Sequence, residues 1–365
     1  MIKVMTIFGT RPEAIKMAPL VKELQKRDGI KCIVCVTAQH REMLDQVLEV
    51  FEIQPDYDLN IMKAGQTLSE ITSRVLLGLE EVIKNELPDI VLVHGDTSTT
   101  FAGGLAAFYN QVSVGHVEAG LRTYDKYSPY PEEMNRQMVG CFTDYHFAPT
   151  EISANNLLKE GKKEESIFVT GNTVIDAMAT TIKEDYNHEI FDWIGKDKLI
   201  LMTAHRRENL GEPMKNIFRA VDRITNEFSD IKVVYPVHLN PLVQNSAKEI
   251  LGDNTKVKLI DPLEVVDMHN FMNKSHLILT DSGGIQEEAP SLGKPVLVLR
   301  DTTERPEGIA AGTLKLVGTD EEKIYTEIKV LLENSDEYEK MSKAVNPYGD
   351  GFASKRIVDE ILKLK

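Results

Sequence analysis

Short apolar runs alternate along the chain with longer segments in which apolar residues recur at helical spacing. In the first half, the apolar runs predict buried strands at 3–8, 31–37, 90–93, 112–117, 145–148 and 167–169. In the second half, they predict strands at 199–203, 231–236, 257–260, 277–280, 296–299 and 314–317. Strands and helices that alternate in this way form parallel sheets covered by helices on both faces, so the pattern predicts an α/β fold.

Local signals place helices between these strands. Pro12 suits the first position of a helix that continues to about residue 27. Thr67 and Glu70 have the spacing of a capping box at the start of another helix. Near the C-terminus, apolar residues fall on one side of a helix expected over 354–362.

The alternation breaks once, in a polar segment at 183–198 that contains the only tryptophan, Trp193. We therefore expect a domain boundary within residues 170–195. A chain of 365 residues is long enough for two domains of ordinary size. The predicted fold is α/β, with two doubly wound Rossmann-like domains whose strand ends face a common cleft.

Composition and charge narrow the choice of partners. Hydrophobic residues make up 42% of the chain and charged residues 27%, values typical of globular proteins. The net charge of −15 disfavours nucleic acid as a partner. Because no apolar run approaches the roughly 20 residues that cross a bilayer, we expect no membrane association. The N-terminus lacks the layout of a signal peptide, which predicts a cytoplasmic protein.

The motifs of common cofactor and metal sites are absent from the sequence. No G-x-G-x-x-G follows the first strand, and no Walker A loop, H-E-x-x-H or acidic calcium loop occurs. Cys32 and Cys35 form a C-x-x-C inside a predicted strand, where residues three apart point to opposite faces. No second pair completes a zinc site, so we interpret both as structural thiols.

Ionisable residues collect where the predicted strands end, and in doubly wound sheets ligands bind outside those carboxyl ends. In the first half these residues are Arg11, Lys16, His94, Asp96, His116, Glu118 and Arg122. In the second half they are His205, Arg206, Arg207, Glu208, His238, Asp281, Ser282, Glu288, Arg300 and Arg305. So many polar residues at equivalent positions predict a binding site, with local cations despite the acidic net charge.

The stretch 280–295 predicts an anion site at one strand end. Ser282, Gly283 and Gly284 lie where a strand passes into a helix, whose first N–H groups are unpaired. Glu287 and Glu288 follow about one turn later and could reach a sugar hydroxyl. The stretch thus fits a nucleotide-phosphate cradle, with an ordinary strand-to-helix turn as the alternative.

A second dense stretch, 116–136, supplies carboxylates. Asp96, Glu118 and Glu132 could converge with the imidazoles of His116 and His205. Several carboxylates in one cleft can hold different pKa values, which separates acid from base roles. The alternative for Glu132, and more so for Glu133, is a favourable charge at a helix N-terminus.

Eight ordered motifs across the chain then resemble one known family. They are Gly9-Thr-Arg-Pro-Glu-Ala, Thr37-Ala-Gln-His-Arg, His94-Gly-Asp-Thr, His116-Val-Glu-Ala-Gly-Leu-Arg-Thr, Pro131-Glu-Glu-Met-Asn-Arg, Thr170-Gly-Asn-Thr-Val-Ile-Asp, His205-Arg-Arg-Glu-Asn and Asp281-Ser-Gly-Gly-Ile-Gln-Glu-Glu. The chain closely resembles the non-hydrolysing UDP-N-acetylglucosamine 2-epimerases. The resemblance implies a glycosyltransferase-B-like fold, with residues 1–170 and the helix in 354–365 forming one domain and 171–353 the other.

The resemblance also implies a reaction and its residues. The family interconverts UDP-GlcNAc and UDP-ManNAc by eliminating UDP to 2-acetamidoglucal and adding it back, without a metal or redox cofactor. It commonly forms homodimers and supplies sugars for surface polysaccharides. By motif position, Asp96, Glu118, Glu132 and His205 match its catalytic residues. Its UDP-sugar-binding residues are matched by Arg11, Lys16, Ser282, Gly283, Gly284, Glu288 and Arg305.

Many bacterial members bind a second, activating UDP-GlcNAc. Gln39, His40, Arg206 and His238 match positions of that allosteric site, whereas Glu42 and Gly65 depart from its pattern. Three alternatives to a non-hydrolysing epimerase stay open: a glycosyltransferase of the same fold, a hydrolysing epimerase that releases free ManNAc, and a non-catalytic nucleotide-sugar sensor.

Overall fold

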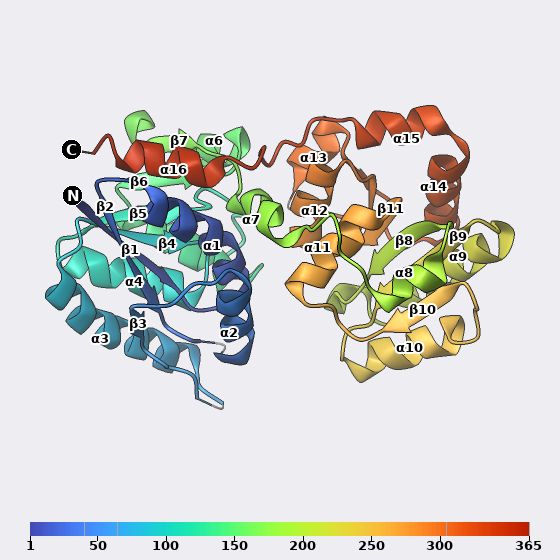
Figure 1. Cartoon of the computed structure of the whole chain (residues 1–365), viewed down its shortest axis with the longest axis horizontal. Coiled ribbons are helices and arrows are strands. Elements are labelled where there is room, and N and C mark those ends of the chain that lie inside the picture. Colours follow the sequence, from blue (N-terminus) through green and yellow to red (C-terminus); the bar gives the residue numbers. More distant parts are fainter. Residues whose placement is uncertain (40, 64, 304, 365) are drawn as a thin grey trace. The chain divides into compact units, whose positions relative to one another are not determined.

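The computed structural model describes residues 1–39, 41–63, 65–303 and 305–364. They form two compact units. Unit 1 comprises Met1–Thr180 and Tyr348–Lys365, and unit 2 comprises Thr181–Pro347 (Figure 1). The junction at Thr180 and Thr181 lies within the segment 170–195. Among the described residues, no helix is both long enough and apolar enough to cross a membrane.

Unit 1 is built on a parallel sheet of seven strands in the order β3-β2-β1-β4-β5-β6-β7. Its strands are β1 (Ile2–Phe8), β2 (Ile30–Val36), β3 (Tyr57–Asp58), β4 (Ile90–His94), β5 (Ser113–Val117), β6 (Tyr145–Ala148) and β7 (Ile167–Val169). Its helices are α1 (Arg11–Lys26), α2 (Arg41–Val50), α3 (Leu68–Glu86), α4 (Ser98–Tyr109), α5 (Glu132–Phe142), α6 (Glu151–Lys159), α7 (Thr173–Thr181) and α16 (Ala353–Ile361), with a 3₁₀ turn at Glu164–Ser166.

Unit 2 is built on a parallel sheet of six strands in the order β10-β9-β8-β11-β12-β13. Its strands are β8 (Lys198–Thr203), β9 (Ile231–Pro236), β10 (Val257–Ile260), β11 (Leu277–Thr280), β12 (Val296–Val298) and β13 (Leu314–Leu316). Its helices are α8 (Glu189–Ile194), α9 (Glu212–Glu227), α10 (Pro241–Leu251), α11 (Val265–Lys274), α12 (Gly283–Glu288), α13 (Pro306–Ala311), α14 (Glu321–Glu333) and α15 (Ser335–Ser342). Two 3₁₀ turns lie at Arg207–Asn209 and Ala289–Leu292.

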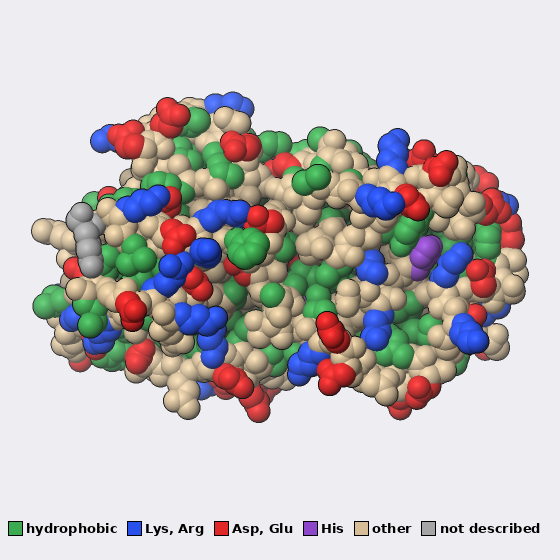
Figure 2. All heavy atoms as spheres, turned by 45° about the horizontal axis from the view of Figure 1, so that its top comes forward, with side chains coloured by type: hydrophobic (Ala, Val, Ile, Leu, Met, Phe, Trp, Pro, Cys, Tyr) green, Lys and Arg blue, Asp and Glu red, His purple; other side chains and the backbone are tan. Residues whose placement is uncertain are grey.

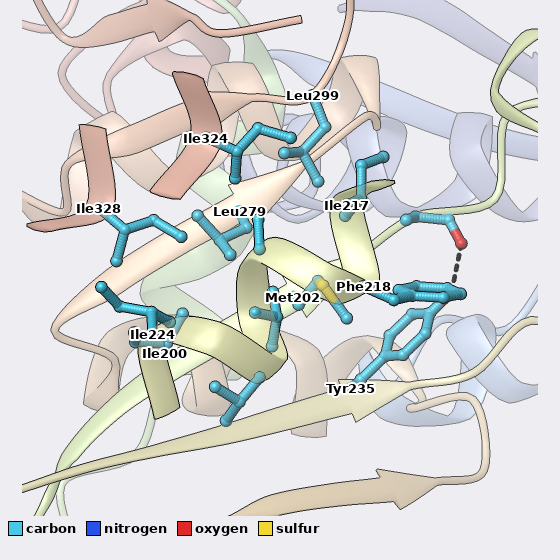
Figure 3. Packing of buried hydrophobic residues seen from close by; sticks show 14 of the residues in the cluster. Ile200, Met202, Ile217, Phe218, Ile224, Tyr235, Leu279, Leu299, Ile324 and Ile328 are labelled. Carbon is cyan, nitrogen blue, oxygen red and sulfur yellow. Dashed lines mark hydrogen bonds between the residues drawn. The ribbon is translucent and has the colours of Figure 1, made fainter. Parts of the chain in front are cut away.

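Each sheet packs against helices through a buried apolar core. In unit 2, Ile217, Phe218 and Ile224 of α9 pack against strand residues such as Met202 and Leu279 (Figure 3). Within this cluster the hydroxyl of Tyr235 donates a hydrogen bond to the carbonyl of Ala204 at 2.5 Å. Bonding a buried polar group in this way avoids its desolvation penalty.

The C-terminal helix α16 packs in the core of unit 1. Its residues Ile357, Val358 and Ile361 are buried with apolar residues of α1. Asp176 accepts hydrogen bonds from the backbone N–H groups of Ala353 and Ser354, at 3.2 and 2.7 Å, and so caps the start of the helix. Figure 1 shows α16, in red, on the side of unit 1 that also carries the N-terminus.

The structure confirms the predicted α/β class and the twelve strands predicted from the apolar runs, each to within about one residue. The predicted capping box is also present, since Thr67 and Glu70 bond reciprocally. The sequence pattern missed β3, an edge strand that is too short to show any alternation. Acidic and basic side chains are interspersed on the face seen in Figure 2.

The cysteine prediction is confirmed in part. Burial raises the pKa of both Cys32 and Cys35 to about 12, so neither is a reactive thiolate. Cys35 is fully buried, but Cys32 is only partly so, because it lies near the start of β2. The third cysteine, Cys141, is exposed on α5. In the described part of the chain, no three His, Cys, Asp or Glu side chains form a group that could hold a metal ion.

Candidate functional site

The predicted site residues lie at the point in each sheet where the strand order reverses. In unit 1, β1 pairs with β2 on one side and with β4 on the other. In unit 2, β8 pairs with β9 and with β11. Loops leaving such neighbouring strands diverge and open a crevice at the carboxyl edge of the sheet. Arg11 and Asp96 follow the two strands of the switch point in unit 1, and Glu118 follows the next strand, β5. His205 and Ser282 follow the two strands of the switch point in unit 2.

A buried glutamate, Glu13, fixes the switch point of unit 1. Its carboxylate accepts hydrogen bonds from the backbone N–H groups of Gly9 and Thr10, at 3.0 and 2.8 Å. It also accepts bonds from the hydroxyls of Thr97 and Thr100, at 2.5 and 3.1 Å. Burial raises the pKa of Glu13 even though these bonds act in the opposite direction. One side chain thus ties the loop after β1 to the loop after β4.

Gly9 is required at this crossing because its Cα lies against two threonines. A Cβ atom added there would lie 1.8 Å from Oγ1 of Thr37 and 2.9 Å from Oγ1 of Thr99. The loop after β1 leads into α1 at Arg11, which is only partly buried. Arg11 therefore sits at the carboxyl edge of the sheet, as the sequence predicted.

Glu118 is held at the end of β5 by residues from three other elements. Lys16 of α1 forms an ion pair with its Oε2 atom. Nδ2 of Asn172 donates a hydrogen bond to the same oxygen at 2.9 Å, and Nε2 of His94 lies 3.8 Å from it. Glu118 has a φ of 63°, in the left-handed region that is uncommon for residues other than glycine. Such backbone strain clusters at functional sites.

Asp96 is held by a different cation. Nε of Arg136 donates to its Oδ2 atom at 2.9 Å, and the Nη2 atom of the same guanidinium lies 2.8 Å away. Arg136 also bonds to Glu133 at 3.0 Å. The guanidinium therefore joins the loop after β4 to the first turn of α5.

The neighbours Glu132 and Glu133 differ sharply. Glu133 is fully buried and accepts bonds from the N–H groups of Thr123 and Tyr124, at 3.0 and 3.1 Å. Burial alone would raise the pKa of Glu133, but these bonds, with those from Gln137 and the charge of Arg136, hold it below its usual value. Glu133 thus anchors the 123–131 segment, beyond the charge–dipole role considered from the sequence. In contrast, Oε2 of Glu132 is buried without a hydrogen-bond partner in the described structure.

Two of the histidines expected at the strand ends of unit 1, His94 and His116, are buried. Burial lowers the pKa of His94 to about 4 and of His116 to about 3, so both imidazoles are neutral near pH 7. Nε2 of His116 lies 2.7 Å from the carbonyl of Gly95. The ring of His116 is therefore bound to the backbone of the loop after β4.

Asp281 organises the switch point of unit 2. Its Oδ2 atom accepts hydrogen bonds from the backbone N–H groups of His205 and Arg206, both at 2.8 Å, and from Nδ2 of Asn209 at 3.1 Å. Its Oδ1 atom lies 3.1 Å from Nδ1 of His205. Burial would raise the pKa of Asp281, but the bonds from His205 and Arg206 outweigh burial and lower it. The carboxylate thereby joins the end of β11 to the loop after β8.

The predicted phosphate turn, Ser282 to Gly284, follows Asp281 directly in the chain. Ser282 and Gly284 are partly exposed, and Gly283 is buried in the first turn of α12. Glu288 lies 3.5 Å from Nε2 of the buried His269. Arg305 is bound to the buried Glu287, with Nε 3.0 Å from Oε1. Glu287 therefore holds Arg305, one of the residues matched to UDP-sugar binding.

The residues matched to an allosteric site are distributed over both units. Gln39 of unit 1 accepts a hydrogen bond from Thr99 at 3.1 Å. In unit 2, Nε of Arg206 donates to the carbonyl of Asp281 at 3.2 Å. The ring of His238 is stacked on that of His205, with centroids 5.7 Å apart. His40 lies outside the described residues.

Two other polar residues at strand ends are structural. Arg122 forms two bonds to Glu160, at 2.7 and 2.9 Å, and its side chain is almost fully buried. Arg300 bonds to Glu208 at 2.8 Å. A cavity of about 1050 Å³ in unit 2 lies beside β10 and α10, and none of the predicted site residues lines it.

Sequence reasoning missed the role of four residues that position others in the site rather than bind a ligand themselves. They are Glu13, Arg136, Asn172 and Asp281. One signal was available for Glu13, since Thr10 and Glu13 have the spacing of a capping box. Asn172 and Arg136 stand inside the quoted motifs, but their partners Glu118 and Asp96 are distant in sequence. No local pattern reveals such pairs.

Comparisons with known proteins agree with the geometry. A family model described as UDP-N-acetylglucosamine 2-epimerase matches residues 22–362. The UDP-N-acetylglucosamine 2-epimerase of Bacillus subtilis strain 168 is 68% identical over 361 residues, which cover 99% of this chain and 95% of that protein.

Solved structures of the same family are also similar to this chain. A crystal structure of a UDP-N-acetylglucosamine 2-epimerase matches with a TM-score of 0.93 and 66% identity, covering 99% of this chain and 95% of that chain. The Neisseria meningitidis UDP-GlcNAc 2-epimerase, solved with UDP-GlcNAc bound, matches with a TM-score of 0.89 and 54% identity, covering 99% and 100%. These neighbours confirm the glycosyltransferase-B-like fold class. Because the matches run through both units and along nearly all of each relative, this chain belongs to the UDP-N-acetylglucosamine 2-epimerase family.

Proposed function

We propose that this protein catalyses the reversible C2 epimerisation of UDP-GlcNAc to UDP-ManNAc without net hydrolysis. The observation that carries the proposal is the setting of Glu118, a strained and nearly buried carboxylate that is paired with Lys16 at the end of β5 in unit 1. Family membership supports the same reaction, as does the relative solved with UDP-GlcNAc bound.

The chemistry explains why carboxylates and an anion site are both needed. The C2 proton of the sugar is very weakly acidic, because no carbonyl lies beside C2. Elimination solves this: a base removes the C2 proton, the C2–H electron pair forms the C1–C2 double bond, and the C1–O pair leaves with UDP. UDP then adds back to 2-acetamidoglucal as an acid delivers a proton to the other face of C2. General acid–base groups and charge stabilisation of the leaving group thus supply the catalysis.

The two units divide this work. The carboxylates Asp96, Glu118 and Glu132 of unit 1 exchange protons with C2, and Arg11 and Lys16 contact the substrate. In unit 2, His205, Arg305 and the turn at Ser282, Gly283 and Gly284 hold the diphosphate, and Glu288 binds the ribose. Unit 1 thus takes the role expected for the domain predicted as residues 1–170 with 354–365, and unit 2 the role expected for the domain predicted as 171–353.

Product analysis tests the proposal against its alternatives. Chromatography of a reaction started from UDP-GlcNAc should show UDP-ManNAc forming and then holding at a constant ratio. Accumulation of UDP with free ManNAc would instead identify a hydrolysing epimerase. Turnover only after addition of an acceptor sugar would identify a glycosyltransferase, and no turnover at all would favour a sensor. The homodimer, the allosteric site and the cytoplasmic location remain predictions from the sequence.

A further inference from the structure

Arg136 of α5 joins two carboxylates of unit 1 that differ in exposure. Its Nε atom donates to Oδ2 of Asp96 at 2.9 Å, and its Nη2 atom lies 2.8 Å from the same oxygen. Its third donor nitrogen, Nη1, donates to Oε2 of Glu133 at 3.0 Å. The side chain of Glu133 is fully buried, whereas 27% of the side chain of Asp96 is exposed. Of these two carboxylates, Asp96 is therefore the one that can meet a ligand.

Glu133 fixes the position of the guanidinium group. Oε2 of Glu133 accepts from Nη1 of Arg136 and from the backbone N–H of Thr123, both at 3.0 Å. Its Oε1 atom accepts from the N–H of Tyr124 at 3.1 Å and from Nε2 of Gln137 at 2.8 Å. Glu133 cannot turn without breaking several of these bonds. Because the guanidinium is planar and rigid, holding its Nη1 atom also restricts its Nε and Nη2 atoms.

The backbone of Asp96 is held by the same turn of α5. Nδ2 of Asn135 donates to the carbonyl of Asp96 at 2.8 Å. One residue earlier in the loop, the N–H of Gly95 donates to the carbonyl of Val117 at 2.9 Å. Asn135 and Arg136 thus hold the carbonyl and the carboxylate of Asp96 together, so the side chain is oriented before a ligand arrives.

The two carboxylate oxygens of Asp96 have different surroundings. Oδ2 faces two nitrogens of a guanidinium, which donates hydrogen bonds but accepts none. A proton on Oδ2 would therefore be set against hydrogens of Arg136. No residue in the described part of the chain forms a hydrogen bond with Oδ1. We propose that Arg136 is a positioning residue that confines the transferable proton of Asp96 to Oδ1.

This inference rests on the proposed function. When Asp96 acts as base, its Oδ1 atom takes the C2 proton, the C2–H pair forms the C1–C2 double bond, and UDP leaves with the C1–O pair. When Asp96 acts as acid, each of these movements runs in reverse. In both directions Arg136 keeps its charge and exchanges no proton, because a guanidinium is not deprotonated in proteins.

Two substitutions of Arg136 separate this role from a structural one. Arg136→Ala removes every bond of the guanidinium. Arg136→Lys keeps the positive charge, but an ammonium group is a point charge that cannot hold both carboxylates in one plane. Arg27→Lys is the matched control, because Arg27 also joins two carboxylates of unit 1, Glu23 and Asp359, at 2.7 Å each. Neither of them is an acid–base group of the proposed reaction.

The kcat of epimerisation is measured for each variant from UDP-GlcNAc and from UDP-ManNAc. Calorimetry with UDP gives affinity and stoichiometry, and kcat is expressed per UDP-binding site so that unfolded protein does not count. For Arg136→Lys we expect kcat to fall by about 10- to 100-fold, as for other small misplacements of catalytic groups. The affinity for UDP should stay within about twofold of wild type, and Arg27→Lys should match wild type throughout.

Isotope effects locate the step that is slowed. A carboxylate on one face of C2 takes the proton from one epimer and returns it when that epimer forms. Each nucleotide sugar is therefore tested with deuterium at C2. If Arg136 acts through Asp96, the isotope effect on kcat of Arg136→Lys should stay at or above the wild-type value for one of the two sugars. A slower closure or product release would lower it toward unity for both.

The inference is overturned if Arg136→Lys retains kcat within about twofold of wild type. It is also overturned if the isotope effects of both sugars fall below wild type, or if the loss appears only in UDP affinity. Should Arg136→Ala fail to fold, Arg136→Lys still decides, because it keeps the positive charge between the two carboxylates. A wild-type protein that forms no UDP-ManNAc would instead reject the proposed function itself.

Discussion

The two switch points share a topology but differ in which charge they present. In unit 1, carboxylates stand at the strand ends, and cations hold them: Lys16 on Glu118 and Arg136 on Asp96. In unit 2 the arrangement is inverted, because the buried carboxylates Asp281 and Glu287 hold His205, Arg206 and Arg305. The same fold therefore presents carboxylates in one unit and cationic or N–H donors in the other.

Under the proposed function, this difference assigns proton transfer to unit 1 and UDP binding to unit 2. Strand order fixes where the site can form, whereas the side chain that is buried beneath each loop decides the sign of the group above it. Substitutions at the corresponding places should therefore separate catalysis from UDP binding. The predictions below run from the largest expected effect on activity to the smallest.

Glu118→Gln should give the largest effect, since it removes a proton-transfer group of unit 1. We expect kcat to fall by about 10²- to 10⁴-fold, the usual range for losing a general acid–base group. UDP affinity, measured by calorimetry, should stay near the wild-type value. Glu80→Gln on α3 serves as control, because Glu80 forms only an exposed pair with Lys84. Equal losses in kcat and UDP affinity would contradict the division between the units.

Asp281→Asn should act mainly on binding. An amide oxygen can still accept from His205, Arg206 and Asn209, but it carries no negative charge, and an NH₂ group replaces the Oδ1 atom beside Nδ1 of His205. We expect UDP affinity to fall by about tenfold or more, since a hydrogen bond to a charged group contributes about 1.5–3 kcal/mol. The exposed Asp253→Asn provides the control. A large fall in kcat with unchanged UDP affinity would contradict the assignment of UDP binding to unit 2.

The carboxylate of Asp281 also makes the stability of unit 2 depend on pH. Because folding lowers the pKa of Asp281 below its usual 3.8, the carboxylate contributes stability above that pH. This stability is lost as pH falls through the lowered folded pKa. The stabilities of wild type and Asp281→Asn should therefore begin to converge only as pH falls below 3.8.

Glu133→Gln and Glu132→Gln should separate structure from chemistry within unit 1. Glu133 accepts several bonds in a fully buried position, so its substitution should lower the free energy of unfolding by about 1–3 kcal/mol in urea titrations. Glu132→Gln should change stability by less than about 0.5 kcal/mol, yet reduce kcat far more. If both variants were equally destabilised, the contrast between these neighbours would be wrong.

Mild acid should loosen unit 1 before unit 2. Burial lowers the pKa of His94, His116 and His146 to about 4, 3 and 4, whereas in unit 2 such a shift is found at His276. Between pH 6.5 and about 4 the unfolded chain therefore binds more protons than the folded one, so stability falls as pH falls.

Hydrogen exchange followed by mass spectrometry at pH 7 and pH 5.5, corrected for intrinsic rates, measures this difference. We expect protection in β4, β5 and β6 to decrease more than in β8 and β9. The raised pKa of Glu13 acts in the opposite direction and offsets part of the loss. A larger decrease in unit 2 would contradict the prediction.

The sequence predicted elements better than partners. Apolar runs located Asp96, Glu118 and Asp281 at strand ends, because a strand buried on both faces is a local signal. The strand Tyr57–Asp58 was not predicted, because two residues are too few to show a pattern. The pairs Asn172–Glu118 and Arg305–Glu287 could not be predicted, since periodicity shows which face a residue occupies but not which distant loop meets it.

The most direct test of the central claim is epimerisation of UDP-GlcNAc in D₂O, followed by NMR at C2 of both nucleotide sugars. The account predicts deuterium at C2 of UDP-ManNAc from the first turnovers and of UDP-GlcNAc as the reaction reverses. UDP-ManNAc that retains protium at C2 would contradict proton exchange by the carboxylates of unit 1.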